Sequence, residues 1–334
     1  MSLHPLMRTL LWPFSLLYGA AVRTRVWTYQ KGWLKQKHLK GAVISVGNLT
    51  VGGTGKTPMV IWLAEKFLAE GKRVAILSRG YRGSHGTSDE VELMKFRLQG
   101  RAAFGVGKDR FAEGERLESQ HPVDIFILDD GFQHLQLARD LNILLLDASR
   151  PLHEERLLPA GLLREPLSAM ARANLVVFTR AETVPGAPES IEKLTPLPIF
   201  STATRLLGFR RCGSGIELQS IPEIGAGPFF VFSGIGNPHA FLRDLQTWSL
   251  PICGWTFFAD HHRYRQRDVL TIQKEGKKAG AKAFVTTEKD AQNLAGLKFQ
   301  APVFISVIDL QVRPESQFHE IVHRLLAAKI GAAA

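Results

Sequence analysis

The chain has 334 residues, of which 45% are hydrophobic and 22% are charged. This composition excludes an intrinsically disordered protein and is sufficient for the cores of two domains of ordinary size. The two cysteines, Cys212 and Cys253, are too few for a disulfide framework or a thiolate metal site, so a reducing cytoplasm fits the sequence. The formal net charge of +11 favours anionic partners.

The N-terminal segment, residues 1–40, is basic and rich in aromatic residues. No Asp or Glu occurs from Met1 to Ala64. The uncharged run Thr9–Val22 has 14 residues, fewer than the ~20 that a spanning helix needs, and Pro13 lies near its start. We therefore predict an amphipathic segment that lies on a membrane surface. Its cationic and indole side chains are Arg8, Arg23, Arg25, Lys31, Lys35, Lys37, Lys40, Trp12, Trp27 and Trp33.

Three other interpretations of this segment remain open. Arg8, the apolar run and the small residues Gly19–Ala21 resemble a secretory signal peptide, although export would separate the protein from intracellular nucleotide. A basic protein can also bind nucleic acid, but no recognition helix, RRM motif or zinc-finger spacing is found. A basic helix that simply joins the core is the third alternative.

A glycine-rich stretch, Gly47–Pro58 (GNLTVGGTGKTP), follows the apolar run Ala42–Ile44 and precedes the predicted helix Met59–Leu68. Such a loop between a strand and a helix can direct main-chain N–H groups at phosphate oxygens, with the positive end of the helix dipole behind them. Lys56 would neutralise the outer phosphates and Thr57 would bind Mg²⁺. The predicted nucleotide-binding residues are Thr50, Val51, Gly52, Gly53, Thr54, Gly55, Lys56 and Thr57.

The loop departs from the usual GxxxxGK[ST] pattern, because Thr50 occupies the position of the first glycine. Pro58 suits the first turn of a helix, which supports the strand, loop and helix order. A flexible turn that binds nothing is the alternative.

The runs that follow predict a parallel α/β fold in two domains. Short, continuous apolar runs alternate with helix-length segments, as in βαβ units, and ligands of such sheets bind at the carboxyl ends of the strands. Strands are expected at 73–78, 124–130, 141–147, 174–179, 228–233, 252–258, 283–287 and 303–308. We predict a nucleotide-binding domain at 41–205, a linker hairpin at 206–226, a smaller α/β domain at 227–310 and a C-terminal helix at 311–334.

Carboxylates follow two of these elements. Asp129 and Asp130 end a strongly apolar strand, where a phosphate-loop enzyme has the acid that completes its Mg²⁺ site. Asp89 follows the strand 73–78 and could accept a proton from an attacking hydroxyl, as a kinase requires. Exposed turn or loop acids are the alternatives at all three positions.

Taken in order, eight motifs resemble the tetraacyldisaccharide 4'-kinase family, which phosphorylates the lipid A precursor of Gram-negative bacteria. The resemblance extends from the N-terminus to about Asp290. The motifs are GNLTVGGTGKTP at 47–58, SRGYRG at 78–83, SDE at 88–90, LDDGFQH at 128–134, LPAGLLREP at 158–166, FSGIGNP at 232–238, DHH at 260–262 and TTEKD at 286–290.

The resemblance implies a P-loop NTPase-like α/β/α domain and a smaller α/β/α domain joined by a two-stranded linker. It implies ATP and Mg²⁺ as cofactors, with Asp129 and Asp130 near the metal and Asp89 paired with His261 for proton transfer. It also implies that Arg110 lies near the phosphates and that Glu165 lies on the nucleotide side.

The activity implied is transfer of the ATP γ-phosphoryl group to the 4'-hydroxyl of tetraacyldisaccharide 1-phosphate, which forms lipid IVA. The expected location is the cytoplasmic face of the bacterial inner membrane, as a peripheral protein with an anionic membrane surface and the lipid disaccharide as partners. Neither nucleic acid nor an obligate protein partner is expected. A soluble phosphate-loop kinase or GTPase, and an ATP-binding assembly factor without phosphotransfer, are the rival classes.

Overall fold

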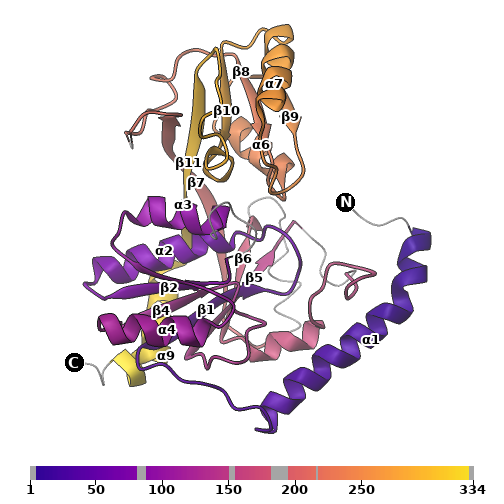
Figure 1. Cartoon of the computed structure of the whole chain (residues 1–334), viewed down its shortest axis with the longest axis vertical. Coiled ribbons are helices and arrows are strands. Elements are labelled where there is room, and N and C mark those ends of the chain that lie inside the picture. Colours follow the sequence, from indigo (N-terminus) through magenta and orange to yellow (C-terminus); the bar gives the residue numbers. More distant parts are fainter. Residues whose placement is uncertain (1–4, 81–87, 150–154, 182–194, 216, 331–334) are drawn as a thin grey trace. The chain divides into compact units, whose positions relative to one another are not determined.

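The computed structural model describes residues 5–80, 88–149, 155–181, 195–215 and 217–330. Tyr81 and Arg82 of the motif at 78–83, and the last four residues of the predicted C-terminal helix, lie outside this range. The chain divides into two compact units (Figure 1). The first comprises Met1–Tyr81, Arg97–Ala203 and Gln311–Ala334, and the second comprises Arg82–Phe96 and Thr204–Leu310.

The first unit contains a parallel sheet in the order β3-β2-β4-β1-β5-β6-β7, to which β7 (Ile199–Arg211) contributes its first residues. Leu117 of α4 and Met170 of the 3₁₀ helix η3 join apolar clusters on one face of this sheet, and α2 and α9 pack against its other face. Its elements are α1 (Pro5–Gln30), β1 (Ala42–Asn48), α2 (Lys56–Ala69), β2 (Val74–Ser78), β3 (Ala103–Val106), α4 (Arg110–Gln120), β4 (Ile125–Asp129), β5 (Leu141–Asp147), η3 (Leu167–Arg172), β6 (Leu175–Thr179) and α9 (Glu315–Ile330).

The second unit repeats the three-layer arrangement on a smaller scale, with parallel strands in the order β11-β10-β8-β9. Alternate residues of β8 face opposite sides, because side chains alternate along a strand: Val231 packs with Leu245 of α6, whereas Phe232 packs with Ile272 of α7. Its elements are β8 (Phe229–Ser233), α6 (Pro238–Thr247), β9 (Ile252–Phe257), α7 (Gln266–Lys278), β10 (Ala283–Thr287) and α8 (Glu288–Ala291). It also contains most of α3 (Asp89–Leu98), β7 (Ile199–Arg211) and β11 (Val303–Arg313).

The predicted parallel α/β fold is confirmed, with differences in how segments are grouped. The chain leaves the first unit within β7 and returns to it within β11, and the C-terminal helix α9 belongs to the first unit. In the segment 206–226, Phe209 and Gln219 exchange two backbone hydrogen bonds of 2.7 Å, as paired residues of a hairpin do. The acid-bearing segment Arg82–Phe96 belongs to the second unit.

The N-terminal helix α1 has two sides of different character. Ser15 and Gly19 are buried against the segment that contains Leu157, and the Ser15 hydroxyl donates a hydrogen bond of 2.9 Å to the Leu157 carbonyl. Elsewhere the helix leaves large apolar residues exposed, namely Met7, Leu10, Trp12, Phe14, Leu16, Leu17 and Trp27. Among the described residues, no helix combines the length and the apolar character that crossing a membrane requires.

Candidate active site

The glycine-rich loop joins β1 to the start of α2. Gly52 and Gly55 have φ values of 116° and 80°, conformations that side chains other than glycine rarely adopt. Gly55 is the N-cap of α2 and provides no side-chain hydrogen bond to the first turn. The N–H groups of this turn and the positive end of the helix dipole are therefore available to an anion, and Lys56 and Thr57 are the first two residues of the helix.

The loop is held from two sides. On one side, Val51 donates a backbone hydrogen bond of 2.8 Å to the Leu162 carbonyl, and Arg164 donates one of 2.7 Å to the Leu49 carbonyl. On the other side, the Arg180 guanidinium donates a hydrogen bond of 2.9 Å to the Gly53 carbonyl and forms an ion pair with the buried carboxylate of Asp147. Thr50 and Thr54 are buried, whereas Val51 is 39% exposed. These contacts fix the loop through the Val51 N–H and through the carbonyls of Leu49 and Gly53.

The two predicted metal-site acids differ in their surroundings. Asp129 is buried and accepts a hydrogen bond of 3.2 Å from the Ser78 hydroxyl. Asp130 forms ion pairs with Lys56 at 3.5 Å and with Arg164 at 2.8 Å. Burial raises the pKa of Asp130, but the two cations outweigh this effect, so the pKa is lower than usual and the carboxylate is ionised at neutral pH.

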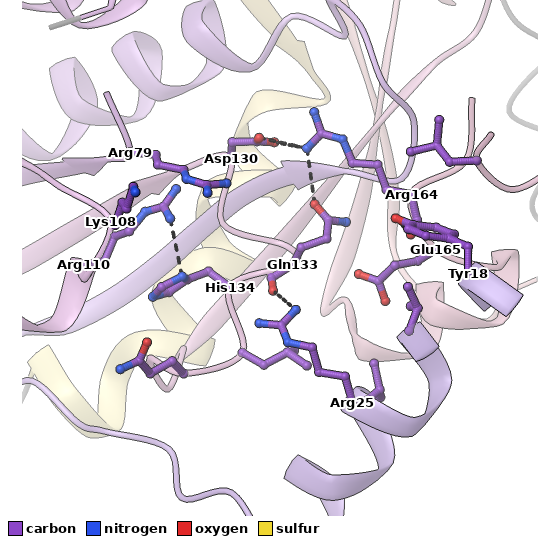
Figure 2. A pocket seen from close by; sticks show the side chains of 15 residues that line it. Tyr18, Arg25, Arg79, Lys108, Arg110, Asp130, Gln133, His134, Arg164 and Glu165 are labelled. Atoms are coloured by element: carbon purple, nitrogen blue, oxygen red, sulfur yellow. Dashed lines mark hydrogen bonds and ion pairs between the residues drawn. The ribbon is translucent and has the colours of Figure 1, made fainter. Parts of the chain in front are cut away.

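A basic pocket of about 630 Å³ adjoins Asp130 in the first unit (Figure 2). One wall comes from α1 and carries Tyr18 and Arg25, whose guanidinium donates a hydrogen bond of 3.1 Å to the Gln133 carbonyl. The side chains labelled in Figure 2 gather around one space, and five of them are cationic. These five cations of the basic pocket are Arg25, Arg79, Lys108, Arg110 and Arg164.

Arg110 is buried in this pocket and lies beside His134. The Arg110 guanidinium lies 3.4 Å from Nδ1 of His134. Burial lowers the pKa of His134 to about 4, and the charge of Arg110 adds to this effect. His134 is therefore neutral at physiological pH and can accept a hydrogen bond from Arg110 or from a ligand. Burial also lowers the pKa of Arg110 below its ordinary value.

Glu165 lines the same pocket, but its carboxylate is engaged. Arg172 donates two hydrogen bonds to it, of 2.8 and 2.9 Å, and the Arg172 guanidinium also lies over the Phe132 ring. The preceding residue, Arg164, accepts a hydrogen bond of 2.8 Å from the Tyr18 hydroxyl at its carbonyl. The ion pair of Glu165 with Arg172 therefore helps to fix the segment 162–165, which forms backbone hydrogen bonds with the phosphate loop.

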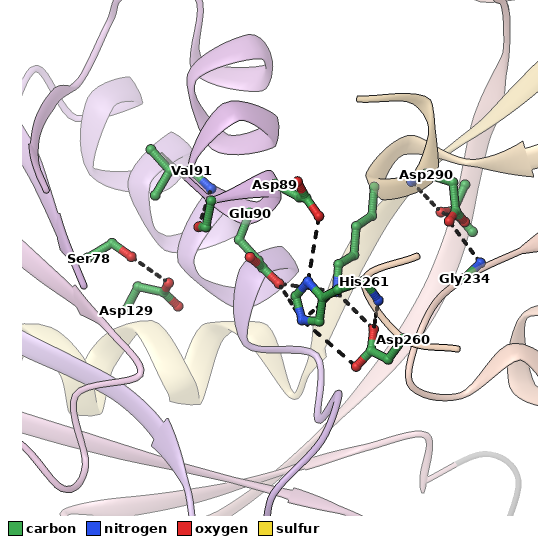
Figure 3. Close-up of polar contacts among 12 residues, drawn as sticks. Ser78, Asp89, Glu90, Val91, Asp129, Gly234, Asp260, His261 and Asp290 are labelled. Atoms are coloured by element: carbon green, nitrogen blue, oxygen red, sulfur yellow. Dashed lines mark hydrogen bonds and ion pairs between the residues drawn. The ribbon is translucent and has the colours of Figure 1, made fainter. Parts of the chain in front are cut away.

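The second unit brings Asp89 and His261 together (Figure 3). Nδ1 of His261 lies 3.6 Å from a carboxylate oxygen of Asp89. The imidazole lowers the pKa of Asp89 although burial opposes this, and the Asp89 carboxylate raises the pKa of His261. His261 has a φ of 59°, and its backbone N–H donates a hydrogen bond of 3.1 Å to the Gly234 carbonyl. The pair is thus assembled within one unit from residues far apart in sequence.

Lys289 completes this cluster. Its ammonium lies 3.1 Å from Glu90 and 3.2 Å from Asp260, and 3.4 Å from Nε2 of His261. The next residue, Asp290, is buried and accepts hydrogen bonds from the Gly234 N–H at 2.8 Å and from the Tyr264 hydroxyl at 3.0 Å. The motif at 286–290 therefore contributes Lys289, which lies beside His261, and Asp290, which binds the backbone of Gly234, the residue that His261 contacts.

The chain is similar to known proteins over most of its length. A sequence profile of the family described as tetraacyldisaccharide-1-P 4'-kinase matches residues 7–327. The chain belongs to this family. The tetraacyldisaccharide 4'-kinase of Geobacter sulfurreducens is 40% identical over 313 residues, covering 88% of this chain and 87% of the relative. That of Geobacter metallireducens is 39% identical over 336 residues, covering 92% and 96%.

A solved member of the tetraacyldisaccharide 4'-kinase family has the same fold. It is the "apo" form of LpxK from Aquifex aeolicus in complex with ATP, with a TM-score of 0.76 and 33% sequence identity, covering 96% of this chain and 99% of that chain. The predicted resemblance to this kinase family and the predicted P-loop NTPase-like fold are thereby confirmed.

Several residues that the structure places beside the predicted ones, in one unit or the other, had no role in the sequence prediction. Arg164, Gln133 and His134 line the basic pocket, Arg180 holds the loop, and Lys289 lies beside His261. All five follow strand ends or lie in the motifs at 128–134, 158–166 and 286–290. Those motifs were the available signal, but nothing in the spacing indicates which side chain of each motif points into the site.

Proposed function

We propose that this kinase transfers the γ-phosphoryl group of ATP to the 4'-hydroxyl of tetraacyldisaccharide 1-phosphate, forming lipid IVA in lipid A biosynthesis. The observation that carries this proposal is the basic pocket, which adjoins the phosphate loop through Asp130 and Arg164 and is walled on one side by the apolar helix α1. A pocket of this kind suits a molecule with a phosphorylated sugar head and acyl chains.

For ATP, the uncapped first turn of α2 and the Lys56 ammonium would bind the phosphates. The Lys56 ammonium lies 3.5 Å from the Asp130 carboxylate, and it can exchange this partner for phosphate oxygens. Arg110 would add a second positive charge where charge develops on the transferred group. Because both cations are fixed before the reaction, little reorganisation opposes the transfer.

The oxygen donors near the loop fit Mg²⁺, which prefers hard oxygen ligands and retains several waters. Thr57 in the first turn of α2 supplies a hydroxyl, and Asp129 supplies a buried carboxylate at the end of β4. Asp130 already pairs with two cations, so we assign the direct contact to Asp129 and an outer, orienting role to Asp130. When bound, Mg²⁺ would neutralise charge on the β and γ phosphates.

Asp89 is the proposed general base, which takes the proton of the 4'-hydroxyl as the bond to phosphorus forms. Its lowered pKa keeps it ionised at neutral pH, and protonated His261 would hold its orientation. Such a general base typically contributes about 10²–10⁴ in rate. The other imidazole nitrogen, Nε2, lies 3.6 Å from Glu90 and 3.9 Å from Asp260, and both of these carboxylates also pair with Lys289.

The acyl chains favour a peripheral position on the cytoplasmic face of the inner membrane, with α1 as the contact. Its exposed apolar side would insert among lipids, and basic residues of its C-terminal half, such as Arg23 and Arg25, would attract anionic headgroups. The adjoining pocket would receive the head of the substrate. No obligate protein partner and no nucleic acid enters this scheme.

Phosphotransfer from γ-labelled ATP tests the proposal. We expect label in a lipid product that requires both Mg²⁺ and the disaccharide precursor, and no label when the precursor already carries the 4'-phosphate. Lys56→Ala should reduce turnover by about 10²–10³, the typical cost of losing one donor to a charged transition state. Lys66→Ala, on the exposed side of the same helix, is the matched control. ATP binding without transfer to any lipid would support the assembly-factor class instead.

A further inference from the structure

Outside the site described above, three potential metal ligands converge in the first unit. Glu70 is the C-cap of α2, and His319 and His323 lie one turn apart on α9. Nε2 of His319 lies 2.8 Å from Oε1 of Glu70, and Nε2 of His323 lies 3.2 Å from the same oxygen. One ligand atom from each residue lies within 4.8 Å of the other two.

The packing of α9 against α2 fixes this arrangement. Residues at i and i+4 share a helix face, so both imidazoles point the same way, and their ring centroids are 4.1 Å apart. Phe318, which is buried, meets Trp62 of α2 edge to face at 5.5 Å. The His323 ring also contacts Phe67 of α2 at 5.8 Å. The two helices therefore hold the ligands whether or not an ion is bound.

The spacing of the ligand atoms suits a tetrahedral ion. Zinc binds histidine nitrogen and carboxylate oxygen at about 2.0–2.2 Å, which places two tetrahedral ligand atoms about 3.4 Å apart. The distances of 2.8 and 3.2 Å to Glu70 are close to that value, so small side-chain rotations would admit an ion. Two imidazoles with one carboxylate form a donor set that favours zinc-like metals over Mg²⁺.

Helix electrostatics supply an independent reason for a cation here. The carboxyl end of a helix carries a partial negative charge, which makes an acidic residue unfavourable and a cation favourable. Glu70 lies at this end of α2. A bound divalent ion would offset both the carboxylate and the helix dipole. The Glu70, His319 and His323 side chains are 27%, 52% and 34% exposed, so an ion can enter from solvent.

We propose that Glu70, His319 and His323 form a binding site for one divalent transition-metal ion of the zinc class, with water in the fourth position. The ion would tie the C-terminal helix to the helix that begins with Lys56 and Thr57. Because Glu70 is 249 and 253 positions away from the two histidines and meets them only in the folded chain, metal binding would stabilise the fold.

The test is a Zn²⁺ titration of the untagged, chelator-treated full chain, without nucleotide and with excess Mg²⁺, followed by calorimetry and by metal analysis after gel filtration. We expect one equivalent to bind and the melting temperature to rise. His319→Ala and His323→Ala should each weaken binding at least tenfold, since even the loss of an outer-sphere partner costs about 10–100-fold. His121→Ala, an exposed histidine at the end of α4, is the matched control and should bind as the wild type does.

Binding of Co²⁺ gives a second measurement. Co²⁺ held tetrahedrally by nitrogen ligands absorbs visible light, and this absorption should be lost when the site of three ligands is disrupted. If an alanine variant fails to fold, Glu70→Gln retains an acceptor for the imidazoles and tests the same site. Circular dichroism checks that each variant is folded. The absence of a bound equivalent in the wild type, or unchanged affinity in the folded variants, would overturn the proposal and leave Glu70 as a hydrogen-bond acceptor for two histidines.

Discussion

At the scale of single residues, the candidate site contains unusual backbone conformations. Asp130, Arg180 and His261 have φ values of 53°, 59° and 59°, a region that costs a residue other than glycine about 1–2 kcal/mol. Each of the three is held by charged partners: Asp130 by Lys56, Arg180 by Asp147 and His261 by Asp89. Strain of this kind is typical of positions whose side-chain direction matters for function.

The Asp89 and His261 pair can be tested by a double-mutant cycle. Because the two groups act as one unit, Asp89→Ala with His261→Ala should reduce kcat little more than the worse single change. We expect that single loss to be about 10²–10⁴. The measurement is kcat at saturating ATP and lipid, with His262→Ala as the neighbouring control. Losses that multiply would show that the residues act separately, and a large effect of the control would move the role to His262.

The same pair should make stability depend on pH. The pKa of His261 is raised above its ordinary 6.5, so the pair stabilises the fold below that pH and its contribution is lost as the pH rises through the raised value. Asp89 has a pKa below its ordinary 3.8, so its contribution is lost only as the pH falls through that lowered value. The contribution is therefore largest between these limits.

We expect wild type to melt above His261→Gln near pH 5–6 and the difference to vanish in mildly alkaline buffer. Since His261 is largely exposed, solvent screening limits the effect to about 1 kcal/mol or less. Thermal melts across the pH range measure it. A difference that grows toward alkaline pH would contradict the assigned direction of the pKa shift.

At the scale of elements, the exposed residues of α1 differ along the helix, and its buried residues are small. Its first half exposes large apolar residues and its second half exposes Arg23 and Arg25, while Ser15 and Gly19 pack closely on Leu157. A Cβ on Gly19 would lie 2.8 Å from Cδ1 of Leu157, which explains the small residue there. The exposed apolar side is therefore not required by the packing of the helix on its own unit.

Leu10→Gln with Leu17→Gln should weaken binding to anionic vesicles. These residues are 73% and 69% exposed, and burying one leucine in an apolar phase is worth about 1.5–3 kcal/mol, so we expect at least a tenfold loss. Co-sedimentation measures the partition. Leu270→Gln on α7, where the leucine is 57% exposed, is the matched control. Equal loss in the control, or none in the double variant, would contradict the role of α1.

At the scale of the whole molecule, the net charge of +11 attracts both anionic lipid and nucleic acid. The dependence of binding on salt concentration distinguishes the two partners, because the Debye length falls from about 10 Å at 0.1 M to about 3 Å at 1 M and charge attraction is then screened. Vesicle binding should weaken but persist at high salt, since the apolar contribution remains, whereas binding to duplex DNA should disappear. Parallel titrations measure both. DNA binding that survives 1 M salt would favour the nucleic-acid interpretation.

From the sequence alone, continuous apolar runs gave the parallel α/β fold, the ordered motifs indicated the family, and a Gly-Lys-Thr sequence after a strand predicted a phosphate loop, because these are local patterns. Ordered motifs also indicated Asp129, Asp130, Asp89 and His261 as candidates. Their partners could not be read in the same way. Asp147 with Arg180, and Glu165 with Arg172, are ion pairs whose members are recognised only when their burial and distances are known.

Tertiary structure alone decided which side chains converge. Side chains at strand ends point into a site or away from it according to the turn that follows, as the positive φ of Asp130 and His261 illustrates. The grouping of Asp89 with His261, and of Glu70 with the histidines of α9, depends on contacts between segments far apart in the chain. Such contacts follow from the packing of whole elements, whose free energy is spread over many apolar residues and leaves no pattern at the polar positions that it brings together.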